Sequence, residues 1–113
     1  MNDLLTFFKA LSDETRLRLV VLLTKQDYCV CELTEILALS QPKISKHLSK
    51  LRDLGFVKTK REAQFIYYQL TINNQAMEAV LQGILDHMHD YEVLVEDSKR
   101  IAQCTLMEKG DLR

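Results

Sequence analysis

Three cysteines are the residues of this 113-residue chain best suited to chemistry. Cys29 and Cys31 are separated by one residue, and Cys104 lies far along the chain. The first residues lack the basic segment that starts an export signal, so we expect a cytoplasmic protein with reduced thiols. An odd number of cysteines argues against a disulfide framework. The thiols therefore indicate binding of a soft metal ion or redox chemistry.

Cys29 and Cys31 lie at the expected start of a helix over residues 31–38, where apolar residues recur on one face. The positive end of the helix dipole lowers the pKa of a nearby thiol and favours the thiolate that binds metal. Residues i and i+2 of a regular helix point in nearly opposite directions. Both sulfurs can therefore hold one ion only if Cys29 precedes the helix or the first turn deforms.

The middle of the chain is basic, although the formal net charge is −1. Residues 40–69 hold seven basic and two acidic side chains, and the segments on either side are acidic. A positive patch of this kind suits a surface that meets nucleic-acid phosphates. The alternative is a helix face that meets only solvent.

The basic stretch begins with a helix that Ser40 can cap and Gly55 can end. Together with the preceding short helix, it predicts a helix-turn-helix across residues 31–54. For His47, packing inside the domain is the alternative to facing DNA. The side chains expected to contact phosphates and base edges are Ser40, Gln41, Lys43, Ser45, Lys46, His47 and Lys50.

Two runs of β-branched and aromatic residues, Phe56–Lys60 and 65–70, predict a hairpin, or wing, across residues 56–70. The four residues between the runs form its expected tip. On this hairpin, the side chains expected to reach the DNA backbone or a minor groove are Lys60, Arg61 and Gln64. The alternative is a hairpin that faces solvent.

Apolar residues at helical spacing also predict a helix at 1–11, a second helix that Ser12 caps and that ends near Lys25, and one long helix over 74–103. The long helix carries more apolar surface than a small domain can cover, so we expect it to pair with its copy in a symmetric homodimer. The expected fold is one domain over residues 1–113, mainly α with a small β-hairpin. The helix that begins after Ser40 is the expected recognition helix, the one that enters the DNA major groove. The two recognition helices of a dimer would fit operator half-sites about 34–36 Å apart.

Together these motifs resemble the ArsR/SmtB family over roughly residues 3–72. The matching stretches are ALSDETRLRLVVLL, CVCEL, SQPKISKHLSKLRDLGFV and IYYQL. The resemblance implies a winged helix-turn-helix dimer, joined through the helices at 1–11 and 74–103, that represses transcription from double-stranded operator DNA. It implies release of the DNA when a metal or metalloid ion binds. It also implies a protein that is not an enzyme, has no membrane partner and holds no permanent cofactor.

Within the family, the Cys-Val-Cys motif resembles the metal box of arsenic- and antimony-responsive repressors. The resemblance makes Cys29 and Cys31 ligands of As(III) or Sb(III), ions that favour three sulfurs. Arsenic sensors with three clustered thiols have a cysteine where this chain has Thr34. Cys104, from the same chain or its partner, is then the candidate third ligand. Otherwise Cys104 is a packing residue, and a small-molecule thiol or water completes the site.

Other functions remain compatible with the sequence. The same cysteine pair resembles the box of cadmium and lead sensors, so the inducer could be Cd, Pb or Zn, although the cysteine-bearing N-terminal extension of the cadmium sensors is expected to be missing here. Asp86, His89 and Asp90, at i, i+3 and i+4, match the position of a zinc site in the last helix, with no later histidine to complete it. A thiol-redox or sulfur-sensing repressor is a further alternative, as is a DNA-binding dimer without a small ligand.

Overall fold

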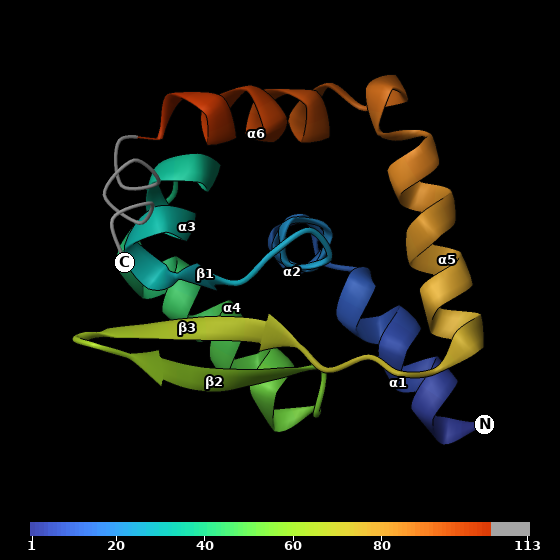
Figure 1. Cartoon of the computed structure of the whole chain (residues 1–113). Helices are drawn as coiled ribbons and strands as arrows, with labels where there is room; N and C mark the ends of the chain where they lie inside the picture. Colours follow the sequence, from blue (N-terminus) through green and yellow to red (C-terminus); the bar gives the residue numbers. More distant parts are fainter. Residues whose placement is uncertain (105–113) are drawn as a thin grey trace.

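The computed structural model describes residues 1–104, which form helices around a small antiparallel sheet (Figure 1). The helix pair followed by a hairpin is a winged helix-turn-helix, so the predicted fold class is confirmed. In chain order the elements are α1 (Asn2–Leu11), α2 (Glu14–Leu23), β1 (Tyr28–Cys29), α3 (Val30–Leu37), α4 (Gln41–Asp53), β2 (Val57–Glu62), β3 (Phe65–Leu70), α5 (Gln75–Asp86), the 3-10 turn η1 (Met88–Asp90) and α6 (Glu92–Gln103).

The hydrophobic core forms around α2, which lies in the middle of the molecule (Figure 1). The apolar stripes expected for the next two helices both face this core, and their buried side chains are Leu33, Ile36, Leu37, Ile44, Leu48 and Leu51. Helix α2 itself is apolar on nearly every side over Leu19–Leu23. It is only ten residues long, and no helix within residues 1–104 is both long and apolar enough to cross a membrane.

Polar side chains set the helix boundaries. Asp13, rather than the predicted Ser12, caps α2, because its carboxylate accepts the backbone N–H of Arg16 at 3.0 Å. The Ser12 hydroxyl instead donates to the Lys9 carbonyl at the end of α1. Ser40 caps α4 as predicted, accepting the backbone N–H of Lys43. These caps begin α2 and α4 at fixed residues.

The sheet contains a strand that the sequence analysis did not predict. Its order is β1-β3-β2, and β1 pairs Tyr28 with Tyr68 and Cys29 with Tyr67. The predicted four-residue tip of the wing is wrong, since Arg61 and Glu62 continue β2 and leave only residues 63 and 64 in the loop. Charged residues are compatible with a strand here because β2 is an exposed edge strand.

The predicted single long helix over residues 74–103 is also wrong. Helix α5 ends at Asp86, η1 follows, and α6 turns back across α2 to reach α3 (Figure 1). His87 and Tyr91 both have φ near −120°, outside the helical range, and form the corner. The turn buries Leu94 and Asp97 against the rest of the same chain. Part of the apolar stripe assigned to a partner is therefore covered within one chain.

Candidate DNA-binding surface and thiol site

Helix α4 presents a polar, basic face opposite its buried stripe. The Gln41 amide donates to the Ser45 hydroxyl at 3.1 Å, so these two side chains hold each other on the helix surface. Among the residues predicted to contact DNA, those exposed on this face are Ser40, Gln41, Lys43, Lys46 and Lys50. The arrangement offers cations and hydrogen-bonding groups to a duplex.

His47 departs from this face and packs within the domain. Its Nδ1 lies 3.6 Å from a carboxylate oxygen of Asp13, and its side chain is 12% exposed. Burial lowers the pKa of His47, an effect that the Asp13 carboxylate opposes. His47 therefore joins α4 to the start of α2 and does not extend the basic face.

The wing exposes its predicted contact residues Lys60, Arg61 and Gln64. Lys60 Nζ lies 3.3 Å from a Glu62 carboxylate oxygen, in a solvent-exposed pair that adds little stability. The sequence analysis missed the apolar side chains near the tip, where Ile66 is 48% exposed. The hairpin thus combines cations with an uncovered apolar surface.

Cys29 occupies the junction between strand β1 and helix α3. It is the last residue of β1 and the N-cap of α3, so it precedes the helix, which is one of the two arrangements that would let both thiols hold one ion. Its sulfur accepts the backbone N–H of Glu32, and its own N–H donates to the Glu32 carboxylate at 3.0 Å. Cys29 is buried, whereas Cys31, inside the first turn, is exposed. The two thiols thus have different surroundings.

The predicted lowering of the thiol pKa is wrong for Cys29. Burial raises the pKa of this thiol, and the nearby Glu32 carboxylate raises it further, while the hydrogen bond from the Glu32 backbone acts in the opposite direction. The helix dipole does not compensate for the loss of water around the sulfur. Cys29 is therefore a neutral thiol near neutral pH and must lose its proton to bind a metal.

Cys104 is buried at the C-terminal end of α6, where its backbone N–H donates to the Ile101 carbonyl. It belongs to the same core as Tyr28, the residue before Cys29. Burial, Glu32 and Cys104 together raise the pKa of Tyr28 to about 12. Within residues 1–104, however, no three His, Cys, Asp or Glu side chains converge on a metal position. The thiols do not form a ready-made three-ligand site.

Comparison with known proteins identifies the class to which this arrangement belongs. Residues 13–59, which contain the helix-turn-helix, match the model of the arsR family of bacterial regulatory proteins. The arsenic resistance transcriptional regulator ArsR1 of Pseudomonas putida is 41% identical over 108 residues, covering 91% of this chain and 83% of that protein. The chain belongs to the ArsR family.

Two further comparisons show how this ArsR-family protein relates to other members. A cadmium resistance regulatory protein CadC homolog of Staphylococcus aureus is 38% identical over 69 residues, covering 60% of this chain and 57% of that protein. The structure of reduced HlyU from Vibrio cholerae superimposes with a TM-score of 0.67 at 32% identity, covering 74% of this chain and 85% of that one. The ArsR-family chain is thus a DNA-binding transcriptional repressor and not an enzyme, as predicted.

The second candidate metal site of the ArsR-family protein was predicted on one continuous helix, and that helix is interrupted at this place. Asp86 ends α5, whereas His89 and Asp90 lie in η1. The Asp86 carboxylate accepts a hydrogen bond from the Gln82 amide at 2.8 Å, and His89 lies 3.4 Å from Asp90. These groups do not share one helical face.

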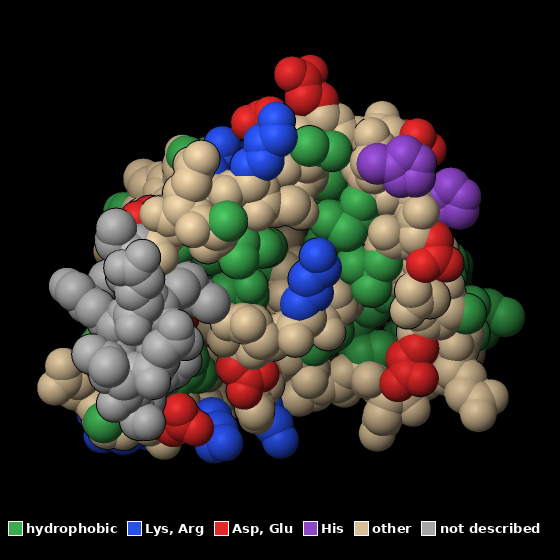
Figure 2. Space-filling model, turned by 45° about the horizontal axis from the view of Figure 1, so that its top comes forward, with side chains coloured by type: hydrophobic (Ala, Val, Ile, Leu, Met, Phe, Trp, Pro, Cys, Tyr) green, Lys and Arg blue, Asp and Glu red, His purple; other side chains and the backbone are tan. Residues whose placement is uncertain are grey.

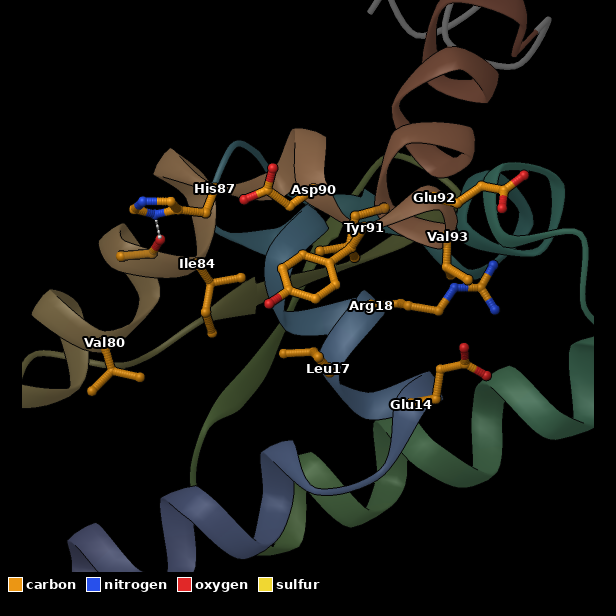
Figure 3. Close-up of a pocket in the computed structure, with 12 residues that line it drawn as sticks. Glu14, Leu17, Arg18, Val80, Ile84, His87, Asp90, Tyr91, Glu92 and Val93 are labelled. Carbon is orange, nitrogen blue, oxygen red and sulfur yellow. Dashed lines mark hydrogen bonds between the residues drawn. The ribbon is translucent and has the colours of Figure 1, made fainter.

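An apolar cavity of about 760 Å³ opens in the ArsR-family fold between α2, α5 and α6. Figure 2 shows hydrophobic side chains gathered in the hollow beside α5. In Figure 3 the ring of Tyr91 extends over Leu17, while the guanidinium of Arg18 points away from Ile84. His87, at the end of α5, also lines the cavity, with Nδ1 2.9 Å from the Gly83 carbonyl. The sequence analysis missed this cavity because it depends on the turn at η1.

Proposed function

We propose that this ArsR-family protein is a homodimeric repressor that releases its operator when As(III) or Sb(III) binds the thiolates of Cys29, Cys31 and Cys104. The observation that carries the proposal is the place of Cys29. Its backbone pairs with Tyr67 of the wing, and the same residue caps the first helix of the helix-turn-helix. A ligand on this sulfur therefore acts on both parts of the proposed DNA-binding surface.

The proposed switch begins at the cap of α3. Metal binding requires the Cys29 thiolate, so the sulfur gives up its proton and its contact with the Glu32 backbone N–H. Loss of an N-cap costs a helix about 1 kcal/mol. Cys31 is exposed inside the first turn of α3, so an ion that joined its sulfur to the buried Cys29 sulfur would distort this turn. That distortion favours a conformation with lower affinity for DNA.

Cys104 is the proposed third ligand because it is the remaining thiol of the chain and lies in the same core as Tyr28. Its position at the end of α6 means that a small shift of this end would bring the sulfur towards β1. Trivalent arsenic and antimony suit such thiolate-rich sites because thiolates are soft ligands.

The proposed DNA contacts come from the polar face of α4, on which Ser45 is half-buried, and from the wing. Lys43, Lys46 and Lys50 would meet phosphates, and Gln41 and Ser45 would reach base edges. Dimerisation through α1 and the C-terminal helices is supported by uncovered apolar side chains: Leu5 is 52% exposed and Phe8 46% exposed on α1. Their burial by a second copy would place two recognition helices on one duplex.

A cadmium-, lead- or zinc-responsive repressor is the second candidate, because the cadmium regulator described above is also similar. Its inducer would use the same Cys29–Cys31 pair. A thiol-redox sensor would instead join cysteines in a disulfide, and the mild oxidant in the titration below tests this alternative.

The proposal is tested by fluorescence anisotropy on a DNA fragment selected by the protein from a random pool. Arsenite, antimonite, cadmium, lead, zinc and a mild oxidant are titrated against the complex of wild type and of each single Cys→Ser variant. We expect arsenite and antimonite to release the DNA, and Cys29→Ser or Cys31→Ser to abolish release while leaving DNA binding intact. Release by zinc alone, or unchanged arsenite release in both variants, would contradict the thiol site.

A further inference from the structure

The C-terminal end of α3 is held by two arginines from other helices. Arg18 of α2 donates through Nη2 to the Leu37 carbonyl at 2.9 Å, and Arg100 of α6 donates through Nε to the Ile36 carbonyl. The last carbonyls of a helix have no partner within it, and cations are favourable at this end. Two long side chains thus complete the hydrogen bonding of α3 directly before the turn to the recognition helix.

Asp97 of α6 joins these two arginines. Its Oδ1 accepts from Arg18 Nη2 at 2.7 Å and from Arg100 Nη2 at 2.8 Å, and its Oδ2 accepts from Arg18 Nε at 2.9 Å. Asp97 is 2% exposed and Arg18 8% exposed, so their pair is buried, whereas the Arg100 side chain is half-buried. We call Arg18, Asp97 and Arg100 the α3 clamp.

We propose that the α3 clamp positions the recognition helix for operator binding. Between Leu37 and the first residue of α4 lie only three residues, so α3 and α4 move together when the end of α3 moves. Cys29 fixes the other end of α3 through its cap. With both ends held, this eight-residue helix sets the angle at which α4 leaves the turn. The inference rests on the operator binding proposed above.

The clamp differs from an ordinary stabilising contact in what it holds. A buried ion pair is often no more stabilising than well-packed apolar residues of the same size. Here, however, both guanidinium groups are directed at backbone carbonyls that precede the turn, and they come from helices on either side of it in the sequence. The network therefore connects α6, which follows the wing, to the helix-turn-helix.

The test compares Arg100→Met with Lys99→Met. Both variants remove one positive charge from α6, but Lys99 is exposed, and its ion pair within residues 1–104 is with Glu96 of its own helix. Operator affinity is measured by anisotropy at several salt concentrations, well below the melting temperature of each variant. We expect Arg100→Met to weaken binding by about tenfold and Lys99→Met to have no effect. The salt dependence should stay that of wild type, because the Arg100 guanidinium is bonded to the Ile36 carbonyl and Asp97 and is not among the proposed phosphate contacts.

Amide hydrogen exchange provides a second readout. Loss of the clamp should speed exchange at Ile36 and Leu37, in the last turn of α3, when no DNA is present. If Arg100→Met does not fold, Arg100→Lys is tested in its place. Lysine keeps the positive charge but lacks the planar guanidinium that reaches the carbonyl and the carboxylate together. We therefore expect Arg100→Lys to lose less operator affinity than Arg100→Met.

Three outcomes would overturn the inference. If the Arg100 variant and Lys99→Met bind the operator with equal affinity, the clamp does not position α4. The Arg100 variant is Arg100→Met, or Arg100→Lys if the former does not fold. A smaller salt dependence in Arg100→Met shows a direct phosphate contact instead. If wild type binds no selected fragment, the proposed function fails and the clamp with it, whereas tight binding by both wild type and the Arg100 variant overturns the clamp alone.

Discussion

The backbone N–H of Cys29 lies 3.0 Å from a carboxylate oxygen of Glu32, and the Cys29 sulfur accepts the backbone N–H of Glu32 in return. This is a capping box in which a thiol occupies the place of the usual hydroxyl. Burial is the main reason for the raised pKa of Cys29, and the Glu32 carboxylate adds to it. Glu32 therefore fixes the start of α3 and also keeps the thiol protonated.

Replacing Glu32 with Gln should make Cys29 more reactive. The Gln side chain keeps an oxygen that can accept the Cys29 N–H but removes the negative charge, so the pKa of the Cys29 thiol should fall. At a fixed pH below 9.0, the ordinary value for this thiol, a larger thiolate fraction should speed alkylation by iodoacetamide a few-fold. Mass spectrometry follows Cys29 and Cys31 separately. Glu35→Gln, on the exposed side of the same helix, is the control, and a slower Cys29 reaction in Glu32→Gln would contradict the assignment.

A third thiol placed at residue 34 should replace Cys104. Thr34 lies in α3 one turn beyond Cys31, and its hydroxyl donates to the Val30 carbonyl at 2.8 Å. If Cys104 is the third ligand, Cys104→Ser should raise the arsenite concentration needed for release by about tenfold, and the double variant Cys104→Ser with Thr34→Cys should recover sensitivity. Cys104→Ser with Thr34→Ser serves as the matched control. Normal release by Cys104→Ser alone would show that the third ligand is not Cys104.

Glycine at residue 38 should stabilise the protein. Ala38 ends α3 with φ 55° and ψ 43°, a left-handed conformation that costs a residue with a Cβ about 1–2 kcal/mol. Glycine also gives the unfolded chain more conformational entropy, which offsets part of this gain. Ala38→Gly should therefore raise the free energy of unfolding by about 0.5–1 kcal/mol and the melting temperature by about 2–6 °C. Ala79→Gly, at an exposed position inside α5, should lower stability by about 1 kcal/mol. The melting temperatures of the two variants are compared with that of wild type. A lower melting temperature in both variants would show that Ala38 is not strained.

The lysines of α4 should control how operator affinity depends on salt. If Lys46 and Lys50 meet phosphates, each change to Ala should weaken binding to every sequence and reduce the slope of log K against log salt by about one. Gln41→Ala should instead change the preferred sequence, because that side chain is proposed to reach base edges. Lys99→Ala is the control for net charge. An unchanged slope in the α4 variants would remove these lysines from the interface.

Much of the fold follows from local patterns. The stripe formed by Ile44 and Leu48 marks the inner face of α4, and Ser40 marks its start, because capping and amphipathic spacing depend on near neighbours in the sequence. The break at η1 has no such signal. Neither glycine nor proline lies between Asp86 and Glu92, and apolar residues keep a helical spacing across the corner. The turn at η1 brings Asp97 beside Arg18, a contact between residues far apart in the sequence that no local pattern indicates.

In the candidate site, too, some features follow from the local sequence and others depend on tertiary packing. The spacing of Cys29 and Cys31 indicates that one ion can bind both sulfurs if Cys29 precedes the helix or if the first turn deforms, and Cys29 does precede the helix. Its raised pKa could not be predicted from the helix dipole alone, because burial depends on the packing of the whole core. Similarly, His47 shares the polar side of α4 in sequence, but only the position of Asp13 shows that it packs inward. The pairing of β1 with β3 was hidden because a two-residue strand leaves no periodic pattern.

The α3 clamp also has a consequence for how the chain reaches its native state. Arg18 and Asp97 are 79 positions apart, so their contact forms only after nearly the whole described chain has been synthesised. Contacts of such long sequence separation carry a large loop-closure cost and slow folding. On the ribosome, the helix-turn-helix and the wing emerge first, while the end of α3 still lacks the partners supplied by α6. Helix α6, made late, therefore supplies contacts to a part of the molecule that was made early.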